Sequence, residues 1–293
     1  MSLAMLNYDV DGPGIISIKW ESVASLKSNR VFEIFLRNGI VVVGSIDSAF
    51  FTLYGIVLDD IIEISPIKDK FLRRLSGDMD IGFSYTKSSK ILQFNLGTGI
   101  TYRMPRLELG MKFNSVITNS SGDSDLTKKQ DFTVDVLRYF DNHYYVIGQL
   151  GWQQNSELGL SSRYLLNAAG GKELIVDNHN RLLAAGGFSF NTEESIENHS
   201  YVGNIDALLI VQYKKFYYSS PKLSLDASFV VYPGLTEWGR VRTELNFKSK
   251  IEIVKDFFIG LTFYDNYDSK PPEGAASKND YGVNFSLGYT FGK

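Results

Sequence analysis

Charged and apolar side chains alternate along residues 240–253 (RVRTELNFKSKIEI), and this spacing carries most of the chemistry that the sequence offers. One face of an extended segment would hold every charged residue in this stretch together with one amide: Arg240, Arg242, Glu244, Asn246, Lys248, Lys250 and Glu252. Alternate side chains of a strand lie on opposite faces. A face with both signs of charge must contact water or neutralise itself through ion pairs. The chemistry expected is therefore electrostatic.

The same polar face is predicted on several other extended segments. Together they would point a large set of charged residues inward: Asp80, Arg103, Arg106, Glu108, Lys112, Arg240, Arg242, Glu244, Lys248, Lys250 and Glu252, with Asp135, Arg163, Asp206, Lys214 and Asp226 beside them. Such a set could line an aqueous path, or it could neutralise itself into a salt-bridged plug. Both signs occur on single strands, which favours a narrow or plugged interior.

Few residues are arranged for catalysis, for metal binding or for cofactor binding. His143, His179 and His199 fall in predicted turns, and no HExxH spacing occurs. The segment GTGITY (97–102) lacks the third glycine of a dinucleotide fingerprint, and GGKEL (170–174) lacks the frame of a P-loop. We therefore predict no enzymatic activity, no metal and no cofactor.

The inward-pointing charged residues must lie on strands that have one polar and one apolar face. Segments with this pattern recur from Asp78 to the C-terminus. The last of them, YGVNFSLGYTF (281–291), has large apolar residues at every second position. About twelve such strands are predicted, near 79–86, 92–104, 106–114, 131–140, 143–153, 158–168, 181–190, 201–214, 222–232, 240–253, 257–266 and 281–291. Roughly ten residues suffice for a tilted strand to cross a bilayer. The pattern predicts an all-β fold, an antiparallel transmembrane β-barrel with an apolar outside and a charged lumen.

Loop lengths support this barrel in part. Short inner turns are predicted near 104–106, 140–143, 169–180, 215–221 and 254–256, and outer loops near 87–90, 119–130, 154–157, 191–200, 233–239 and 267–280. The three longest and most polar loops fall on the outer side, as in bacterial outer-membrane barrels. The acidic loop 191–200 (Glu193, Glu194, Glu197) could bind divalent cations that bridge lipopolysaccharide, although a solvated loop is the simpler interpretation.

Composition excludes other classes of protein. The chain has 293 residues, a formal net charge of −3 and no cysteine, so it has neither a basic footprint for nucleic acid nor a disulfide scaffold. No apolar run approaches the roughly 18 residues of a spanning helix. The opening Met1-Ser2-Leu3-Ala4 resembles a cloning remnant, and we expect a signal peptide to have been removed.

Residues 1–70 are predicted to form a separate small β-domain, and residues 71–293 the barrel. A strand at 15–20, a hairpin at 30–46 with Asn38-Gly39 as its type I′ turn, and one or two strands at 55–67 suggest an SH3-like or Sm-like barrel. Its acidic strands give no basis for RNA binding. In an envelope protein this domain would be periplasmic.

The stretch IIEISPI (61–67) and the run from Phe71 to Arg103 resemble the salt-induced outer-membrane protein family, a domain-of-unknown-function family of Gram-negative outer-membrane β-barrels. The similarity rests on Gly77, Gly82, Ser84, Thr86 and Ser89, and on the closing LGYTF (287–291). The resemblance implies a location in the cell outer membrane. Expected partners are then outer-membrane lipid, lipopolysaccharide and the barrel-assembly machinery.

The sequence leaves the biochemical role open between passive, porin-like passage of an unknown small solute and a structural or stress-related envelope role. One alternative is a lipid-modifying enzyme on the barrel wall, which would need a serine placed beside His143 or His199. The other alternative is a soluble all-β binding protein, in which the apolar face packs a sandwich core.

Overall fold

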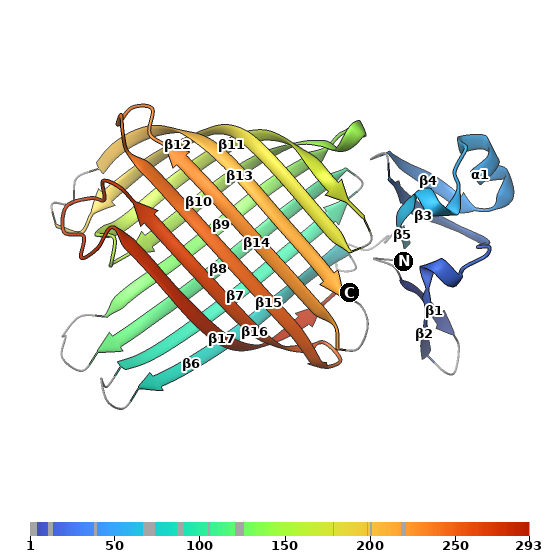
Figure 1. Ribbon diagram of the computed structural model, residues 1–293, viewed down its shortest axis with the longest axis horizontal. Coiled ribbons are helices and arrows are strands. Elements are labelled where there is room, and N and C mark those ends of the chain that lie inside the picture. The colour runs from blue at the N-terminus through green and yellow to red at the C-terminus, as the bar shows by residue number, and fades with distance from the viewer. Residues whose placement is uncertain are drawn as a thin grey trace.

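Twelve antiparallel strands form a closed barrel in the computed structural model, which describes residues 5–10, 14–37, 40–66, 74–86, 91–104, 106–120, 126–177, 179–197, 199, 201–217 and 221–292. Each strand pairs with its neighbours in chain order, and the last closes on the first (Figure 1). The barrel strands are β6 (Leu75–Thr86), β7 (Ile91–Met104), β8 (Leu107–Ser120), β9 (Thr127–Tyr139), β10 (Tyr144–Asn155), β11 (Leu160–Val176), β12 (Asn180–Ser195), β13 (Tyr201–Tyr217), β14 (Leu223–Pro233), β15 (Val241–Val254), β16 (Phe257–Asp268) and β17 (Asn279–Phe291). The predicted all-β barrel of about twelve strands is confirmed.

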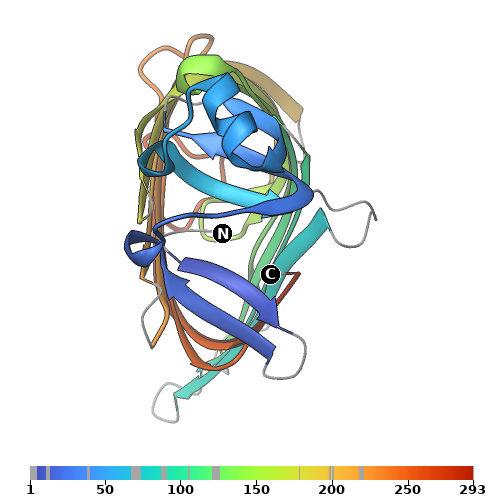
Figure 2. The same ribbon diagram turned by 90° about the vertical axis from the view of Figure 1, so that its right-hand side faces the viewer.

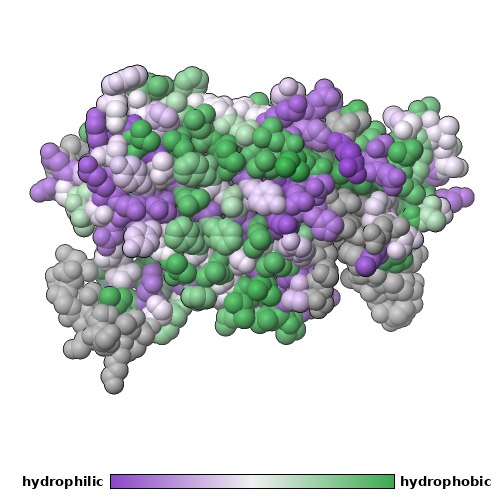
Figure 3. All heavy atoms as spheres, in the orientation of Figure 1, coloured by the Kyte–Doolittle hydropathy of each residue, from purple (hydrophilic) through white to green (hydrophobic). Residues whose placement is uncertain are grey.

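Large apolar side chains are exposed on the outside of this barrel. Phe83, Leu150 and Phe285 have 69%, 59% and 69% of their surface exposed, whereas buried positions on the strands include many charged residues. Figure 3 shows apolar side chains gathered over the middle of the barrel wall. This arrangement is the reverse of a soluble core, and it follows from strict alternation in the strands.

Two predicted loops are strand for much of their length. Strand β11 continues to Val176 and β12 begins at Asn180, so the predicted inner turn at 169–180 is wrong. Small residues such as Gly170 and Gly171 interrupt the apolar alternation there, but they pair fully with β12. The predicted outer loop 191–200 is also wrong over its first half, because β12 continues to Ser195.

We name the two ends of the barrel by their connections. The inner end carries the short turns near 105–106, 140–143, 177–179, 218–222 and 255–256, together with the C-terminus. The outer end carries the connections 121–126, 156–159, 196–200, 234–240 and 269–278.

The N-terminal region forms its own hydrophobic core. Strands β1 (Met5–Val10) and β2 (Gly14–Lys19) form one sheet, and β3 (Ser28–Leu36), β4 (Val41–Ile46) and β5 (Ile61–Pro66) form another. The described part of this region also contains 3₁₀ turns at Trp20–Ser22 and Leu58–Asp60 and the helix α1 (Ser48–Tyr54), and a further 3₁₀ turn, Asp141–His143, lies between β9 and β10 of the barrel. Buried Ile34, Ile46 and Ile64 lie in a core to which Trp20 also belongs.

The hairpin prediction for this region is confirmed in its strands, while its Asn38-Gly39 turn lies outside the described residues. Helix α1 was not expected from the sequence. Asp47 caps it, since its Oδ1 accepts the N–H of Phe50 at 2.8 Å, and this bond lowers the pKa of the carboxyl.

The N-terminal region lies across the inner mouth of the barrel, as Figure 2 shows. The ring of His143, in the turn between β9 and β10, donates from Nε2 to the Arg37 carbonyl at 2.7 Å and meets the Phe35 ring edge-on. Burial raises the pKa of Glu33, Glu63 adds to that rise, and Arg74 and Arg103 oppose it. Acidic residues of the small domain therefore face cations at the barrel mouth.

We predict that the barrel assembles without this domain. A chain beginning near Phe71 should still form a barrel that migrates faster unboiled than boiled on a denaturing gel, because the core around Ile34 contains no barrel residue. The same gel on the full chain is the control. A truncated chain that never assembles would show that the N-terminal region templates the barrel, and that the boundary near residue 70 is wrong.

Candidate functional site: the barrel lumen

Three arginines and three carboxylates form a buried network at the outer end of the lumen. Arg240 is 4% exposed; its guanidinium contacts Glu193 on β12 and donates to Asp268 on β16, with Nη2 2.6 Å from Oδ2. Arg163 on β11 binds the same two carboxylates, at 2.6 Å from Glu193 and 3.6 Å from Asp268. Each arginine fork is thereby neutralised by acids from other strands.

A third pair extends the network. Arg242 Nη2 lies 2.5 Å from Asp206 Oδ2, and the amide of Asn191 donates to the same oxygen at 2.7 Å. The Tyr232 ring lies 4.6 Å from the Arg242 guanidinium carbon and is itself buried. Charged groups this deeply buried remain ionised only when they are paired and hydrogen-bonded.

Several contacts at this level cross the whole lumen. Gln153 on β10 donates to Glu244 on β15 at 3.0 Å, and Asn155 on β10 donates to Asp280 on β17 at 2.7 Å. Lys129 Nζ on β9 lies 3.1 Å from the centre of the Tyr264 ring on β16. Each pair joins strands with four others between them on the shorter way round. Side chains therefore fill the lumen from wall to wall here, consistent with its flattened outline (Figure 2).

A loop covers the outer mouth above these contacts. The connection between β16 and β17 reaches the turn between β10 and β11, where the N–H groups of Ala276 and Ser277 donate to the Glu157 carbonyl at 3.0 and 3.1 Å. The hydroxyl of Ser195 donates to the Glu273 carbonyl at 2.6 Å. Beneath this loop Leu160 is 1% exposed. The outer end is thus closed by both a loop and an ion-pair network.

The inner half of the lumen has a different arrangement. Lys248 Nζ on β15 lies 2.5 Å from Asp80 and 3.4 Å from Asp78 on β6, and Lys250 lies 2.7 Å from Asp78. Only β16 and β17 lie between these strands. Arg103 and Glu108 pair at 2.7 Å on adjacent strands. Ion pairs here follow the wall instead of crossing it.

The structure brings together most of the residues that the sequence predicted to face inward. Arg240, Arg242 and Glu244 belong to the outer closure, while the others lie nearer the middle or inner end: Asp80, Arg103, Glu108, Lys112, Lys248 and Lys250. Arg106 lies in the exposed turn between β7 and β8 and pairs with Asp141 at 2.9 Å, so it is at the rim. Glu252, near the inner end of β15, pairs with Lys222 at 2.7 Å.

Four charged residues of the outer closure were not expected from the sequence to lie in the lumen. Glu193 was assigned to a solvated, cation-binding loop, but it is 5% exposed and binds two arginines. Asp268 and Asp280 were assigned to an outer loop, and Lys129 to another, because strands were expected to end near the membrane surface. Extending the alternation past the predicted ends would have placed Glu193 on the same face as Asn191 and Ser189.

Among the described interactions, His143 and His199 do not contact a serine hydroxyl. His143 contacts Arg37, Phe35 and Glu173, and His199 is 70% exposed in its side chain and lies 3.3 Å from Glu194. Across the described ranges, no cluster of three or more His, Asp and Glu residues has the arrangement of a metal site. No helix among the described residues has both the length and the apolarity to span a membrane.

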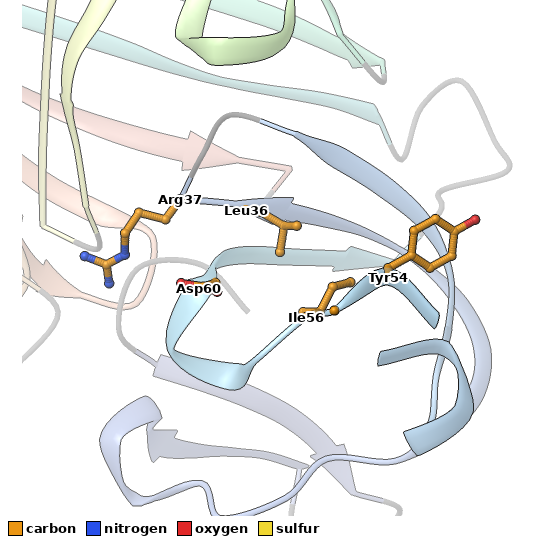
Figure 4. A pocket seen from close by; sticks show the side chains of 6 residues that line it. Leu36, Arg37, Tyr54, Ile56 and Asp60 are labelled. Atoms are coloured by element: carbon orange, nitrogen blue, oxygen red, sulfur yellow. The ribbon is translucent and has the colours of Figure 1, made fainter. Parts of the chain in front are cut away.

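Two shallow depressions lie elsewhere. One of about 390 Å³ is in the N-terminal region, and Figure 4 shows the side chains that line it, among them Leu36, Arg37, Tyr54, Ile56 and Asp60. The other, of about 450 Å³, lies on the outer wall near the inner end, beside Phe140, Tyr144 and Lys172.

Comparison with solved structures finds similarities at low sequence identity and with TM-scores below 0.5. The translocator domain of the autotransporter NalP from Neisseria meningitidis is 11% identical, with a TM-score of 0.40 over 73% of this chain and 87% of its own. The NanC porin is 10% identical, with a TM-score of 0.44 over 74% and 98%. CdiB from Escherichia coli is 12% identical, with a TM-score of 0.38 over 90% and 53%.

Sequence comparison gives a more direct relationship. No significant match was found among curated proteins. A family described as "Protein of unknown function, DUF481" matches residues 79–291, which extend from β6 to the end of β17 and contain eleven complete barrel strands. The match therefore covers most of the chain and almost all of the barrel. The chain belongs to the DUF481 family.

Proposed function

We propose that this protein is an integral β-barrel of the outer membrane with a closed lumen, and that its role in the envelope is structural or stress-related. The observation that carries the proposal is the outer closure, in which Arg240 binds Glu193 and Asp268 under the loop that joins β16 and β17. A general-diffusion pore needs a continuous aqueous path. Wall-to-wall polar contacts at the outer end interrupt such a path.

The proposal places the apolar outer wall in lipid and the long polar loops on the outer side, against lipopolysaccharide. The N-terminal region is then periplasmic, next to the inner mouth. The closing segment LGYTF (287–291) serves as the signal for the barrel-assembly machinery. No catalytic step is assigned, because no nucleophile contacts His143 or His199 among the interactions described.

Planar-bilayer recordings test the closed lumen. The purified full-length protein should insert and yet show about a tenth or less of the single-channel conductance of an open porin of similar strand number, since its lumen is filled by side chains. A porin that conducts under the same conditions is the control. Stable, porin-sized openings of this protein would contradict the closure and favour passive passage of small solutes.

A further inference from the structure

The seam that closes the barrel, between β17 and β6, is shorter than every other seam. These strands are registered over five residue pairs, from Phe291↔Gly77 to Leu287↔Ile81. All other neighbouring barrel strands are registered over nine pairs or more. The five pairs lie at the inner end, and Figure 1 shows β6 and β17 diverging toward the outer end.

Beyond these pairs each strand has a partner on one side only. Among the described residues, Phe83–Thr86 pair with β7 and Asn279–Asn284 pair with β16, but the two segments have no register with each other. Gly82 still lies against β17, because a Cβ there would be 2.2 Å from the Phe285 carbonyl oxygen, so the strands separate beyond this residue. Backbone N–H and C=O groups without a hydrogen-bond partner are strongly disfavoured in hydrocarbon. Free edges at this depth therefore require a polar partner.

The outer side and the lumen side of this opening differ in polarity. On the outside, Phe83, Tyr281 and Phe285 are each 69% exposed, and they present apolar surface. On the lumen side most side chains are uncharged and polar: Ser84 on β6, Gln93 and Asn95 on β7, and Asn284 and Ser286 on β17. The exception is Asp280 on β17, which accepts a hydrogen bond from Asn155 and lies 3.9 Å from Lys129. The charged residues of β6 lie within the paired half, where Lys248 and Lys250 neutralise Asp78 and Asp80.

We propose that the outer half of the β17–β6 seam is a lateral portal that admits a zwitterionic phospholipid from the surrounding lipid into the lumen. Its acyl chains would contact Phe83 and Phe285, while its head group would bond to the free strand edges and to amide and hydroxyl side chains. A head group without net charge matches a lining in which the charge of Asp280 is balanced by Lys129 at 3.9 Å. The proposal rests on the barrel being embedded in a membrane, and it goes beyond a structural role.

The test uses a lock across the seam. Continuing the register of Leu287↔Ile81 would place Ser84 opposite Asn284, so S84C/N284C can close the opening by a disulfide only if the strands move together. The native chain has no cysteine to interfere. In the full-length S84C/N284C variant, the photo-crosslinking residue p-benzoylphenylalanine replaces Asn114. Asn114 is an exposed residue of β8 that faces the lumen. The same label in place of the lipid-facing Phe83 is the matched control.

Both proteins are placed in vesicles of phosphatidylethanolamine and phosphatidylcholine, irradiated in the reduced and oxidised states, and analysed by intact mass. We expect a phospholipid adduct at Asn114 when reduced, and at least about a fivefold loss when oxidised, because a registered seam leaves no opening. The Phe83 adduct should form in both states. Vesicles rich in phosphatidylglycerol should give less adduct at Asn114.

Four results would overturn the portal. They are no lipid adduct at Asn114 in the reduced state, an adduct that oxidation leaves unchanged, a stronger adduct with anionic lipid, and a polypeptide adduct, which would assign the free edges to strand addition. If Phe83 also gave no lipid adduct, the membrane-embedded barrel would itself be contradicted and the portal with it. An adduct at Phe83 but not at Asn114 contradicts the portal alone.

Discussion

Replacing Arg240 with alanine should open the lumen. The substitution leaves Glu193 and Asp268, which are 5% and 2% exposed, with Arg163 as their remaining arginine partner. Breaking a buried ion pair by removing one partner costs about 3–5 kcal/mol, so the freed carboxylates are expected to draw water into the network. Single-channel conductance should rise by about tenfold and favour cations, because the lining gains net negative charge.

The control for this prediction is Lys222→Ala, which removes an ion pair to Glu252 at the inner end, where the lysine side chain is 52% exposed. Exposed pairs contribute about 0–1 kcal/mol, so this variant should behave like the wild type in bilayers and on heating. Equal conductance of R240A and the wild type would show that the network does not obstruct the lumen.

Replacing Phe247 with arginine should block assembly of the barrel. Phe247 is near the middle of β15, opposite Ala227 on β14 and Phe263 on β16. An arginine on the lipid face near the midplane costs roughly 2–4 kcal/mol. The folded fraction can be measured at each urea concentration from the mobility of unboiled samples on a gel. We expect the urea concentration at which half of the protein is folded to be lower for F247R than for the wild type.

Two matched variants sharpen this result. Asn246→Arg introduces the same side chain one position away, on the lumen face, and should assemble nearly normally. Leu245→Arg should be milder than F247R, because Asp265 is directly opposite on β16 and can pair with the new cation. Similar damage from N246R and F247R would mean that the faces of β15 are misassigned.

Alternation of side chains was sufficient to predict the barrel, because a membrane-type wall imposes a period of two on every strand. Strand β15 shows this most clearly, with Arg242 buried in the lumen network and Phe247 on the other face. The prediction failed where small residues weaken the pattern, as at Gly170 and Gly171 on β11. It also missed α1, whose seven residues give too short a pattern to recognise.

The ion pairs of the lumen were less predictable. Strand order reveals which residues are neighbours along the wall, but not which strands face each other across the lumen. The contact between Lys129 and Tyr264, or between Gln153 and Glu244, depends on barrel shear and on the flattening of its cross-section. Glu193 and Asp268 were missed for a second reason, since β12 and β16 extend beyond the length expected for a membrane crossing.

Extraction and gel mobility decide whether these twelve strands form a membrane-embedded barrel. We expect the full-length protein to stay in the membrane fraction after carbonate treatment, to need detergent to dissolve, and to migrate faster on a denaturing gel before boiling than after. A protein that leaves the membrane with carbonate and remains soluble without detergent would contradict the membrane-embedded barrel.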